Sequence, residues 1–346
     1  MKPDGVSPEA ANPDGASLED LDYALPPEHI AQQPARPRDA SRLLIVDRAR
    51  GAQGPFDERV FRDLPDCIGR DDLVVVNDTR VVPARLHGRK PSGGSVEVLL
   101  LERHPDGTWL ALLRASGQAR AGARFEFPGA AAEVVEVPGG GRVRLRFDLD
   151  DESLLVKLGE MPLPPYIRRH AREDDLRDYQ TIFAERDGAV AAPTASLHFT
   201  PQVVERLRIA RLTLHVGPGT FRPIRSGRLA DHRLDSERYQ IGDSTAQAIR
   251  DTRARGGRVV AVGTTVVRAL ETTGGEAGEG RTDLFVRPGD GFRVVDELIT
   301  NFHLPRSSLL ALVMAFGGVE RVRAAYRHAI DAGFRFYSYG DAMWLR

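Results

Sequence analysis

Alternating hydrophobic and polar residues fill most of the chain from residue 72 to residue 148. The runs are LVVVNDTR, VVPARLHGR, SVEVLLLER, TWLALLRAS, ARFEFP, AAEVVEV and RVRLRFD, with turn-forming segments such as KPSGG (90–94) and HPDG (104–107) between them. A period of two is typical of strands with one buried face, and turns about every 8–12 residues favour a barrel or a sandwich. We therefore predict a small β-barrel.

After residue 150 the pattern alternates between helical and strand-like periods. Helices are predicted at 153–158, 202–208, 244–255, 265–272, 307–316 and 320–332, and strands at 212–216, 259–262, 284–286, 294–299 and 334–339. The prolines of MPLPPY (161–166) interrupt this pattern, because proline fixes φ and lacks an amide donor. Strands that alternate with helices favour an α/β layer.

The chain of 346 residues is long enough for two domains at about 100–200 residues each. Residues 21–68 hold too few strands to fold alone, so we expect them to pack with the C-terminal half and the barrel to be an insertion. The predicted boundaries are 1–16 for a disordered tail, 17–72 and 155–346 for a mixed-sheet α/β domain, and 73–154 for the inserted barrel domain.

Charge and cysteine content exclude several classes of protein. The 48 Lys and Arg residues against 49 Asp and Glu leave a net charge of −1, so any polyanion partner would have to be met by a local patch. The single cysteine, Cys67, excludes an internal disulfide and a Cys-based zinc site, and it favours the cytoplasm. The longest apolar run, 309–316, is far shorter than the roughly 20 residues that cross a membrane, so no membrane association is expected.

A buried strand at 258–262 continues through Gly263 into a helix. The free amides of a helix start, with the hydroxyls of Thr264 and Thr265 beside them, suit a carboxylate or a phosphate. A plain turn in which Thr264 caps the helix explains the same spacing equally well.

Three other segments place polar side chains beside predicted elements. In LHVGPGT (214–220), His215 precedes a Gly-Pro-Gly turn that lets backbone approach a ligand, and APTASLHF (192–199) and TNFHLPRSS (300–308) are polar loops. Side chains that satisfy loop backbone groups are an equally good interpretation. His198, His215, His232 and His303 lack metal-ligand spacing, so no metal is expected. No covalent Ser or Cys nucleophile is expected either.

In their order along the chain, these motifs are similar to those of the S-adenosylmethionine:tRNA ribosyltransferase-isomerases, enzymes of queuosine biosynthesis. The resemblance covers nearly the whole chain. It includes LDYALP (21–26), IAQQP (30–34), NDTRVVPARL (77–86), GEMPLPPYI (159–167), YQT (179–181), APT (192–194), LHF (197–199), LHVG (214–217), VGTT (262–265), ITNFHLP (299–305) and YSYGDAM (337–343).

The resemblance implies an activity, a fold and partners. The ribosyl group of S-adenosylmethionine would be transferred to, and isomerised on, 7-aminomethyl-7-deazaguanine at the wobble position of tRNA, giving epoxyqueuosine, adenine and methionine. S-adenosylmethionine would be consumed as a substrate, so no cofactor is expected. The implied fold is an α/β domain with an inserted β-barrel. The implied partner is the tRNA anticodon loop, with no protein partner and a monomeric enzyme.

The resemblance also implies site residues. A sulfonium cation acidifies the neighbouring ribose carbon, so a carboxylate or a neutral His must remove a proton there, and the departing adenine must be protonated. The candidates for proton transfer are Asp78, His198, His215, Glu237 and His303.

Substrate binding is implied for a larger set. It comprises Thr264, Thr265 and Arg268 for the methionyl carboxylate, Phe302, Tyr337 and Tyr339 for stacking on the wobble base, Arg80, Arg85 and Arg306 for tRNA phosphates, and Thr194, Gly217, Gly219, Thr220, Gly263, Asn301 and Asp341 at other motif positions. Ordinary core packing explains each aromatic residue as well.

Four residues depart from the family pattern. Ser196 stands where the family has Gly, Asp235 where it has His, Val266 where it has Ser, and Arg287 where it has Tyr. These departures leave two alternatives open. One is a paralogue that uses S-adenosylmethionine as ribosyl donor to a small-molecule amine, and the other is a non-catalytic RNA- or nucleotide-binding protein, against which the retained histidines argue.

Overall fold

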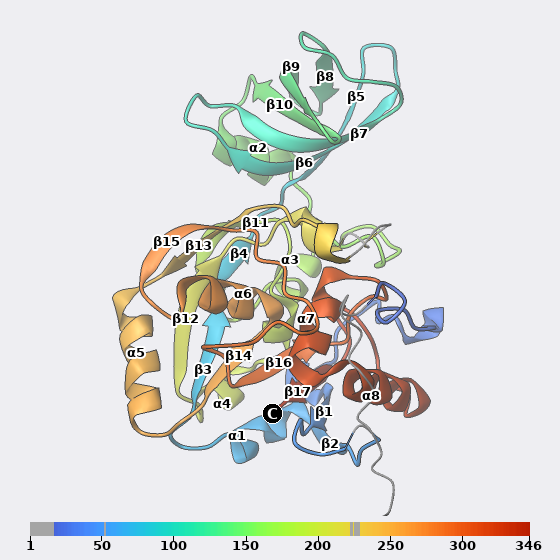
Figure 1. Cartoon of the computed structure of the whole chain (residues 1–346). Coiled ribbons are helices and arrows are strands. Elements are labelled where there is room, and N and C mark those ends of the chain that lie inside the picture. The colour runs from blue at the N-terminus through green and yellow to red at the C-terminus, as the bar shows by residue number, and fades with distance from the viewer. Residues whose placement is uncertain (1–16, 52, 222–223, 225–228) are drawn as a thin grey trace, which may run out of the picture.

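The computed structural model describes residues 17–346 apart from 52, 222–223 and 225–228. The predicted tail, 1–16, lies outside the described residues. Figure 1 shows an α/β body with a β-barrel at one end of it. The predicted fold class, a mixed-sheet α/β domain that carries a small barrel, is confirmed. Within the described residues no helix is both long and apolar enough to span a membrane.

Nine strands of the described chain form one mixed sheet in the body. In spatial order they are β15 (Gly278–Thr282), β13 (Glu237–Ile241), β12 (Ile209–Leu214), β3 (Leu73–Asn77), β14 (Val259–Val262), β16 (Glu297–Asn301), β17 (Ala342–Leu345), β1 (Arg42–Val46) and β2 (Asp57–Val60). Strand β1 lies beside β17, so this part of the N-terminal segment packs with the C-terminal half.

Four neighbouring strands of this sheet, β12, β3, β14 and β16, run parallel. Val75 of β3 pairs with Ala210 on one side and with Ala261 on the other. Since β3 points toward the barrel in Figure 1, the four carboxyl ends meet at the edge of the sheet nearest the barrel. Ligands of open α/β sheets bind outside this edge.

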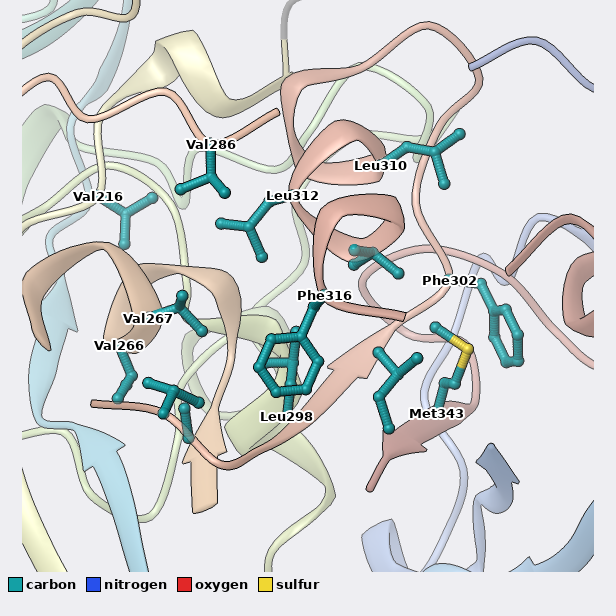
Figure 2. Close-up of a cluster of buried hydrophobic side chains, with 14 of the residues drawn as sticks. Val216, Val266, Val267, Val286, Leu298, Phe302, Leu310, Leu312, Phe316 and Met343 are labelled. Atoms are coloured by element: carbon teal, nitrogen blue, oxygen red, sulfur yellow. The ribbon is translucent and has the colours of Figure 1, made fainter. Parts of the chain in front are cut away.

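Both faces of the sheet are buried. Alternate residues of β3 belong to two different hydrophobic clusters, as the two-residue period of a strand requires. The first cluster lies under α5 (Asp243–Ala254), α6 (Thr264–Thr273), α7 (Ser308–Gly317) and α8 (Val319–Asp331), and the second under α1 (Leu64–Cys67) and α4 (Pro201–Val204). Figure 2 shows part of the first cluster, to which α6 contributes Val267, α7 contributes Leu312 and β16 contributes Leu298.

The barrel has its own core. Its strands are β5 (Arg85–Arg89), β6 (Ser95–Arg103), β7 (Trp109–Ala115), β8 (Arg124–Phe127), β9 (Ala130–Gly139) and β10 (Arg142–Phe147), closed in the order β10-β7-β6-β5-β8-β9. A Cβ at Gly88 would lie 2.6 Å from the Glu126 carbonyl oxygen, so glycine lets β5 approach β8 and close the barrel.

The remaining elements of the described residues are short. They are β4 (Thr79–Val81), which pairs with β11 (Arg186–Ala189), the helices α2 (Asp151–Leu158) and α3 (Asp175–Asp178), and the 3₁₀-helices η1 (Pro27–His29), η2 (Arg38–Ala40), η3 (Phe61–Asp63), η4 (Thr194–His198), η5 (Pro218–Phe221) and η6 (Leu229–Asp231). The β4–β11 pair lies where the chain leaves the body for the barrel.

The structure corrects three predictions. Residues 73–77 were predicted within the barrel domain but form β3 at the centre of the sheet, because all five side chains are buried and only a strand covered on both faces can bury them. Residues 284–286 form no strand, since β15 ends at Thr282. Residues 334–339 turn instead of extending, with Tyr337 at a φ of 70°, and the last strand is β17.

Candidate functional site

The predicted motifs meet at the carboxyl edge of the four parallel strands. Asn77 ends β3, His215 follows β12, Gly263 follows β14, and Asn301 ends β16. The Asn77 side chain links two of these strands, because its amide donates to the Leu214 carbonyl oxygen over 2.8 Å. The parallel register of the sheet thus brings together residues that lie far apart in the sequence.

Two cavities open at this edge. The narrower one lies between η4, the start of α6 and the end of β16. The larger cleft lies between the body and strands β6, β7 and β10 of the barrel. Val216 lines both, so the two cavities adjoin.

The narrower cavity collects seven of the sixteen predicted binding residues. These are Thr194, Gly263, Thr264, Thr265, Asn301, Phe302 and Tyr337, together with His303 of the proton-transfer candidates. Tyr166, which the sequence analysis did not single out, also lines it, with its ring centroid 4.7 Å from that of Tyr337. Among the described residues that line this cavity, none is Asp or Glu.

Helix α6 presents its N-terminus to the narrower cavity. The N-cap is Gly263, whose φ of 92° suits glycine, and no side chain caps the helix. The alternative in which Thr264 caps the helix is wrong, because Thr264 is already its first helical residue. The first amides of a helix lack intrahelical acceptors, so this end can bind a carboxylate.

His215 lies in the larger cleft with its ring held in place. Its Nδ1 atom is 2.8 Å from the Thr79 hydroxyl, and burial lowers its pKa, with Arg238 and Arg186 adding to the effect. A Cβ at Gly188 would lie 2.8 Å from Nδ1, so glycine makes room for the ring. A lowered pKa leaves the imidazole neutral at pH 7, as a proton acceptor requires.

Glu237 and Arg268 form a buried ion pair behind the cleft. One Glu237 oxygen accepts from the Gly217 amide over 2.7 Å and the other from Arg268, while Arg268 also donates to the Leu284 carbonyl oxygen over 2.9 Å. Their side chains are each 5% exposed. Arg268 therefore lies apart from the narrower cavity and fixes Glu237 and the Gly217 turn.

Asp78 lies close to the cleft but lines neither cavity. Its carboxylate accepts from the Thr213 hydroxyl over 2.7 Å, and Arg186 is 3.9 Å away. Burial raises the pKa of Asp78, although the Thr213 hydrogen bond and Arg186 oppose the rise.

The two histidines on the narrower-cavity side are buried, and burial lowers the pKa of each to about 3. Nε2 of His303 lies 2.7 Å from the Thr300 hydroxyl. His198 does not line the cavity, and its ring nitrogens lie 2.8 Å from the Ser41 hydroxyl and 3.1 Å from the Asn301 amide nitrogen.

Three predicted binding residues serve the core. Tyr339 is 2% exposed, and its hydroxyl donates to Asp175 over 3.1 Å. Phe302 is fully buried within an aromatic cluster, although its edge reaches the cavity. Asp341 accepts from the backbone amides of Arg42 and Arg335. Of the three aromatic candidates for base stacking, Tyr337 is left with the most open position.

The predicted arginines lie in three different places. Arg80 is half-exposed on β4, where its Nε is 3.4 Å from Asp187 of the cleft. Arg85 begins the barrel and donates to the Leu163 carbonyl oxygen over 3.0 Å. Arg306 pairs with Asp22 and lines neither cavity.

The remaining predicted residues belong to the turn after β12. Gly217 lines the larger cleft, and a Cβ at Gly219 would lie 3.1 Å from Asp235, so this turn lies against Asp235. The side chain of Thr220 lies outside the described residues.

The four departures from the family pattern have different surroundings. Asp235 accepts from Arg142 of β10 over 2.6 Å, which connects the body to the barrel across the cleft. Ser196 and Val266 are fully buried, and Arg287 lies on a surface turn where its amide donates to Asp290. The sequence analysis missed Arg142, because only the fold brings β10 over residue 235.

A metal site is not supported. Within the part of the chain that the structure describes, no group of three or more His, Cys, Asp or Glu side chains is arranged to hold a metal ion.

Comparisons with known proteins agree with the sequence motifs. Residues 18–345 match the family model described as queuosine biosynthesis protein. The chain is 51% identical to the S-adenosylmethionine:tRNA ribosyltransferase-isomerase of Anaeromyxobacter sp. (strain Fw109-5), over 95% of this chain and 98% of that protein. The enzyme of the same name from Acidiphilium cryptum (strain JF-5) is also 51% identical, over 95% of this chain and 99% of that protein.

A solved structure is similar as well. The S-adenosylmethionine tRNA ribosyltransferase of Thermotoga maritima matches with a TM-score of 0.53 and 36% identity, covering 94% of this chain and all of that one. The family's own motifs line two adjoining cavities at the carboxyl edge of the sheet. With these matches, the chain belongs to the queuosine biosynthesis protein family.

Proposed function

We propose that this protein transfers the ribosyl group of S-adenosylmethionine to 7-aminomethyl-7-deazaguanine at the wobble position of tRNA and isomerises it, releasing adenine and methionine. The observation that carries the proposal is the pair of adjoining cavities, which meet at Val216. One suits a small nucleoside and the other suits a base presented by a larger partner. Full-length relatives named for this activity support the same conclusion.

S-adenosylmethionine would bind at the narrower cavity. Its lining is mostly apolar, with Tyr166, Phe302 and Tyr337 as aromatic walls, which suits adenine. The methionyl carboxylate would bind to the N-terminus of α6 at Thr264 and Thr265, where the helix dipole favours an anion. S-adenosylmethionine would be consumed, so no separate cofactor is proposed.

The tRNA would approach from the side of the barrel. Arg186, Arg238 and Arg281 line a polar groove that also contains Glu102 and Glu279 and shares His215 with the cleft. Arg281 also pairs with Glu102 of β6, so this groove extends from the body to the barrel. Such a groove is the local Arg patch that a chain with a net charge of −1 needs in order to bind a polyanion.

Among the proton-transfer candidates, His215 is best placed to act on the ribose. It lies in the cleft close to Val216, the residue shared by both cavities, and it is neutral at pH 7. The carbon next to the sulfonium would lose its proton to this imidazole, and the departing adenine would gain one. Glu237, whose two oxygens are both occupied, would hold the Gly217 turn beside it.

The enzyme would act as a monomer without a protein partner. A cytoplasmic location fits an enzyme that acts on tRNA and S-adenosylmethionine.

Adenine release tests the proposal. The protein is incubated with S-adenosylmethionine and with tRNA that carries the aminomethyl base, and adenine is measured by chromatography. Release that requires this tRNA is expected. Release that requires a small amine instead would favour a paralogue with another acceptor, and binding without release would favour a non-catalytic RNA-binding protein.

A further inference from the structure

The orientation of the Asn301 side chain follows from its neighbours. The amide nitrogen Nδ2 lies 3.2 Å from the Tyr337 carbonyl oxygen and 3.5 Å from the Asp341 carbonyl oxygen. Carbonyl oxygens only accept hydrogen bonds, so the donor end of the amide must face them. The third neighbour of Nδ2, Nε2 of His198 at 3.1 Å, must therefore accept as well.

This arrangement determines the tautomer of His198. With Nε2 as an acceptor, the proton of the neutral ring is on Nδ1, which donates to the Ser41 hydroxyl over 2.8 Å. Burial keeps the ring neutral, since it lowers the pKa of His198 to about 3, and the ring packs against Phe61 with centroids 5.1 Å apart. Both nitrogens are used within the protein, and His198 does not reach the cavity.

The oxygen of the same amide is left without a partner. Asn301 is 2% exposed, it lines the narrower cavity, and its Oδ1 atom has no hydrogen bond to any described residue. Buried side-chain acceptors are rarely left unsatisfied, and here the donor end is turned toward the protein, so Oδ1 is the atom of this amide that is free to accept from a bound group.

The lining of the cavity limits what that ligand group is. None of the described residues that line it is acidic, so the protein offers no counter-charge to an ammonium group beside Oδ1. The ammonium group of S-adenosylmethionine would instead lie beside the ligand's own carboxylate at the N-terminus of α6. A neutral amino group needs no counter-charge to donate to Oδ1. The aromatic rings of Tyr166 and Tyr337 beside Asn301 provide the flat walls that a purine needs.

We propose that Asn301 Oδ1 accepts a hydrogen bond from the 6-amino group of the adenine of S-adenosylmethionine, and that His198 is a positioning residue that keeps the Asn301 amide in this orientation. The inference rests on the proposed function in one respect, namely that S-adenosylmethionine occupies the narrower cavity. It makes Asn301 the residue that distinguishes adenine from purines without the amino group, and it removes His198 from the proton-transfer candidates.

Binding of two ligands to the full-length protein tests Asn301. Calorimetry compares S-adenosylmethionine with its analogue in which hydrogen replaces the 6-amino group. The wild-type protein is expected to prefer S-adenosylmethionine about 10- to 100-fold, because the analogue leaves Oδ1 buried and unsatisfied. Asn301→Ala should reduce this preference to about threefold or less, since no acceptor remains to be satisfied.

The outcomes separate this inference from the proposed function. If wild-type protein binds both ligands equally well, the role of Asn301 is wrong while the substrate assignment stands, and this result does not depend on whether the variant folds. If Asn301→Ala keeps the wild-type preference, another residue reads the amino group. If S-adenosylmethionine does not bind at all, the proposed function fails and the inference fails with it.

A pair of variants tests His198. His198→Gln offers an amide oxygen that can accept from Asn301 in place of Nε2, whereas His198→Leu offers none. His198→Leu should raise KM for S-adenosylmethionine about tenfold with kcat within about threefold, and His198→Gln should restore KM. The pH profile of kcat should be the same in both variants. A large loss of kcat in His198→Gln with a shifted pH profile would make His198 a proton-transfer residue and overturn the positioning role.

Discussion

Replacing Arg268 by Met should destabilise the body strongly. The substitution leaves Glu237 as a buried carboxylate, with the Gly217 amide as its remaining donor among the described residues, and takes a donor from the Leu284 carbonyl oxygen. Breaking a buried ion pair on one side costs about 3–5 kcal/mol, because the remaining charge stays desolvated. Removing both partners, in Arg268→Met/Glu237→Leu, should cost only about 1–2 kcal/mol, since no charge is left behind.

Urea unfolding measures these free energies. The chain has two tryptophans, Trp109 on β7 of the barrel and Trp344 on β17 of the body, so in a Trp109→Phe background the fluorescence of Trp344 reports on the body. A matched control is Arg250→Met, which breaks an ion pair at the surface. In this pair a guanidinium nitrogen of Arg250 lies 2.9 Å from a carboxylate oxygen of Glu276, and the side chains are 50% and 67% exposed, respectively. This surface pair should contribute about 0–1 kcal/mol.

Two results would refute the reasoning about the buried pair. One is an Arg268→Met variant no less stable than the Arg250→Met control. The other concerns the double variant Arg268→Met/Glu237→Leu. If its loss of unfolding free energy equals the sum of the losses in Arg268→Met alone and in Glu237→Leu alone, then Arg268 and Glu237 do not interact.

Three further predictions concern the cleft. His215→Asn should lower kcat about 10²- to 10⁴-fold. Because the pKa of His215 is lowered, kcat/KM of the wild-type protein should fall only below about pH 6.5, and a fall that begins above that pH would contradict a neutral His215 base. Gly188→Ala should lower kcat/KM at least about tenfold, because the new Cβ would displace the His215 ring. Gly256→Ala is the control for backbone strain, since Gly256 also has a positive φ but its Cβ would meet no atom within 4 Å, and equal kcat/KM in the two variants would show that the close approach at Gly188 is unimportant. Arg238→Gln should weaken tRNA binding and reduce, by about 1, the magnitude of the slope of the logarithm of the binding constant against the logarithm of the salt concentration. Filter binding measures this slope, and an unchanged slope would exclude a contact of Arg238 with a tRNA phosphate.

Much of the fold could be predicted from periodicity. The barrel strands alternate, and the helices α5 to α8 lie within a few residues of their predicted bounds, because amphipathic patterns follow burial. The position of β3 could not be predicted in this way. Its five consecutive buried residues directly precede the barrel strands along the chain, and only the pairing of β3 with β12 and β14 shows that it belongs to the sheet.

The site was predictable where polar residues directly follow apolar strands. His215 directly follows β12 and Asn301 ends β16, and the fold gathers them with Gly263, which follows β14, at one edge. Contacts between distant segments could not be predicted. Arg268 is suited to a carboxylate in sequence, but Glu237, 31 residues away, is the carboxylate it binds. His198 looks like a proton-transfer residue until Ser41, 157 residues away, is seen to occupy its Nδ1.

Adenine release in single-turnover experiments tests the central claim most directly. Protein in excess over S-adenosylmethionine is mixed with tRNA that carries 7-aminomethyl-7-deazaguanine at the wobble position, and with the same tRNA that carries guanine there. The account predicts that one adenine and one methionine appear for each modified tRNA formed, with the first tRNA only. Adenine release that is equal with both tRNAs would contradict it.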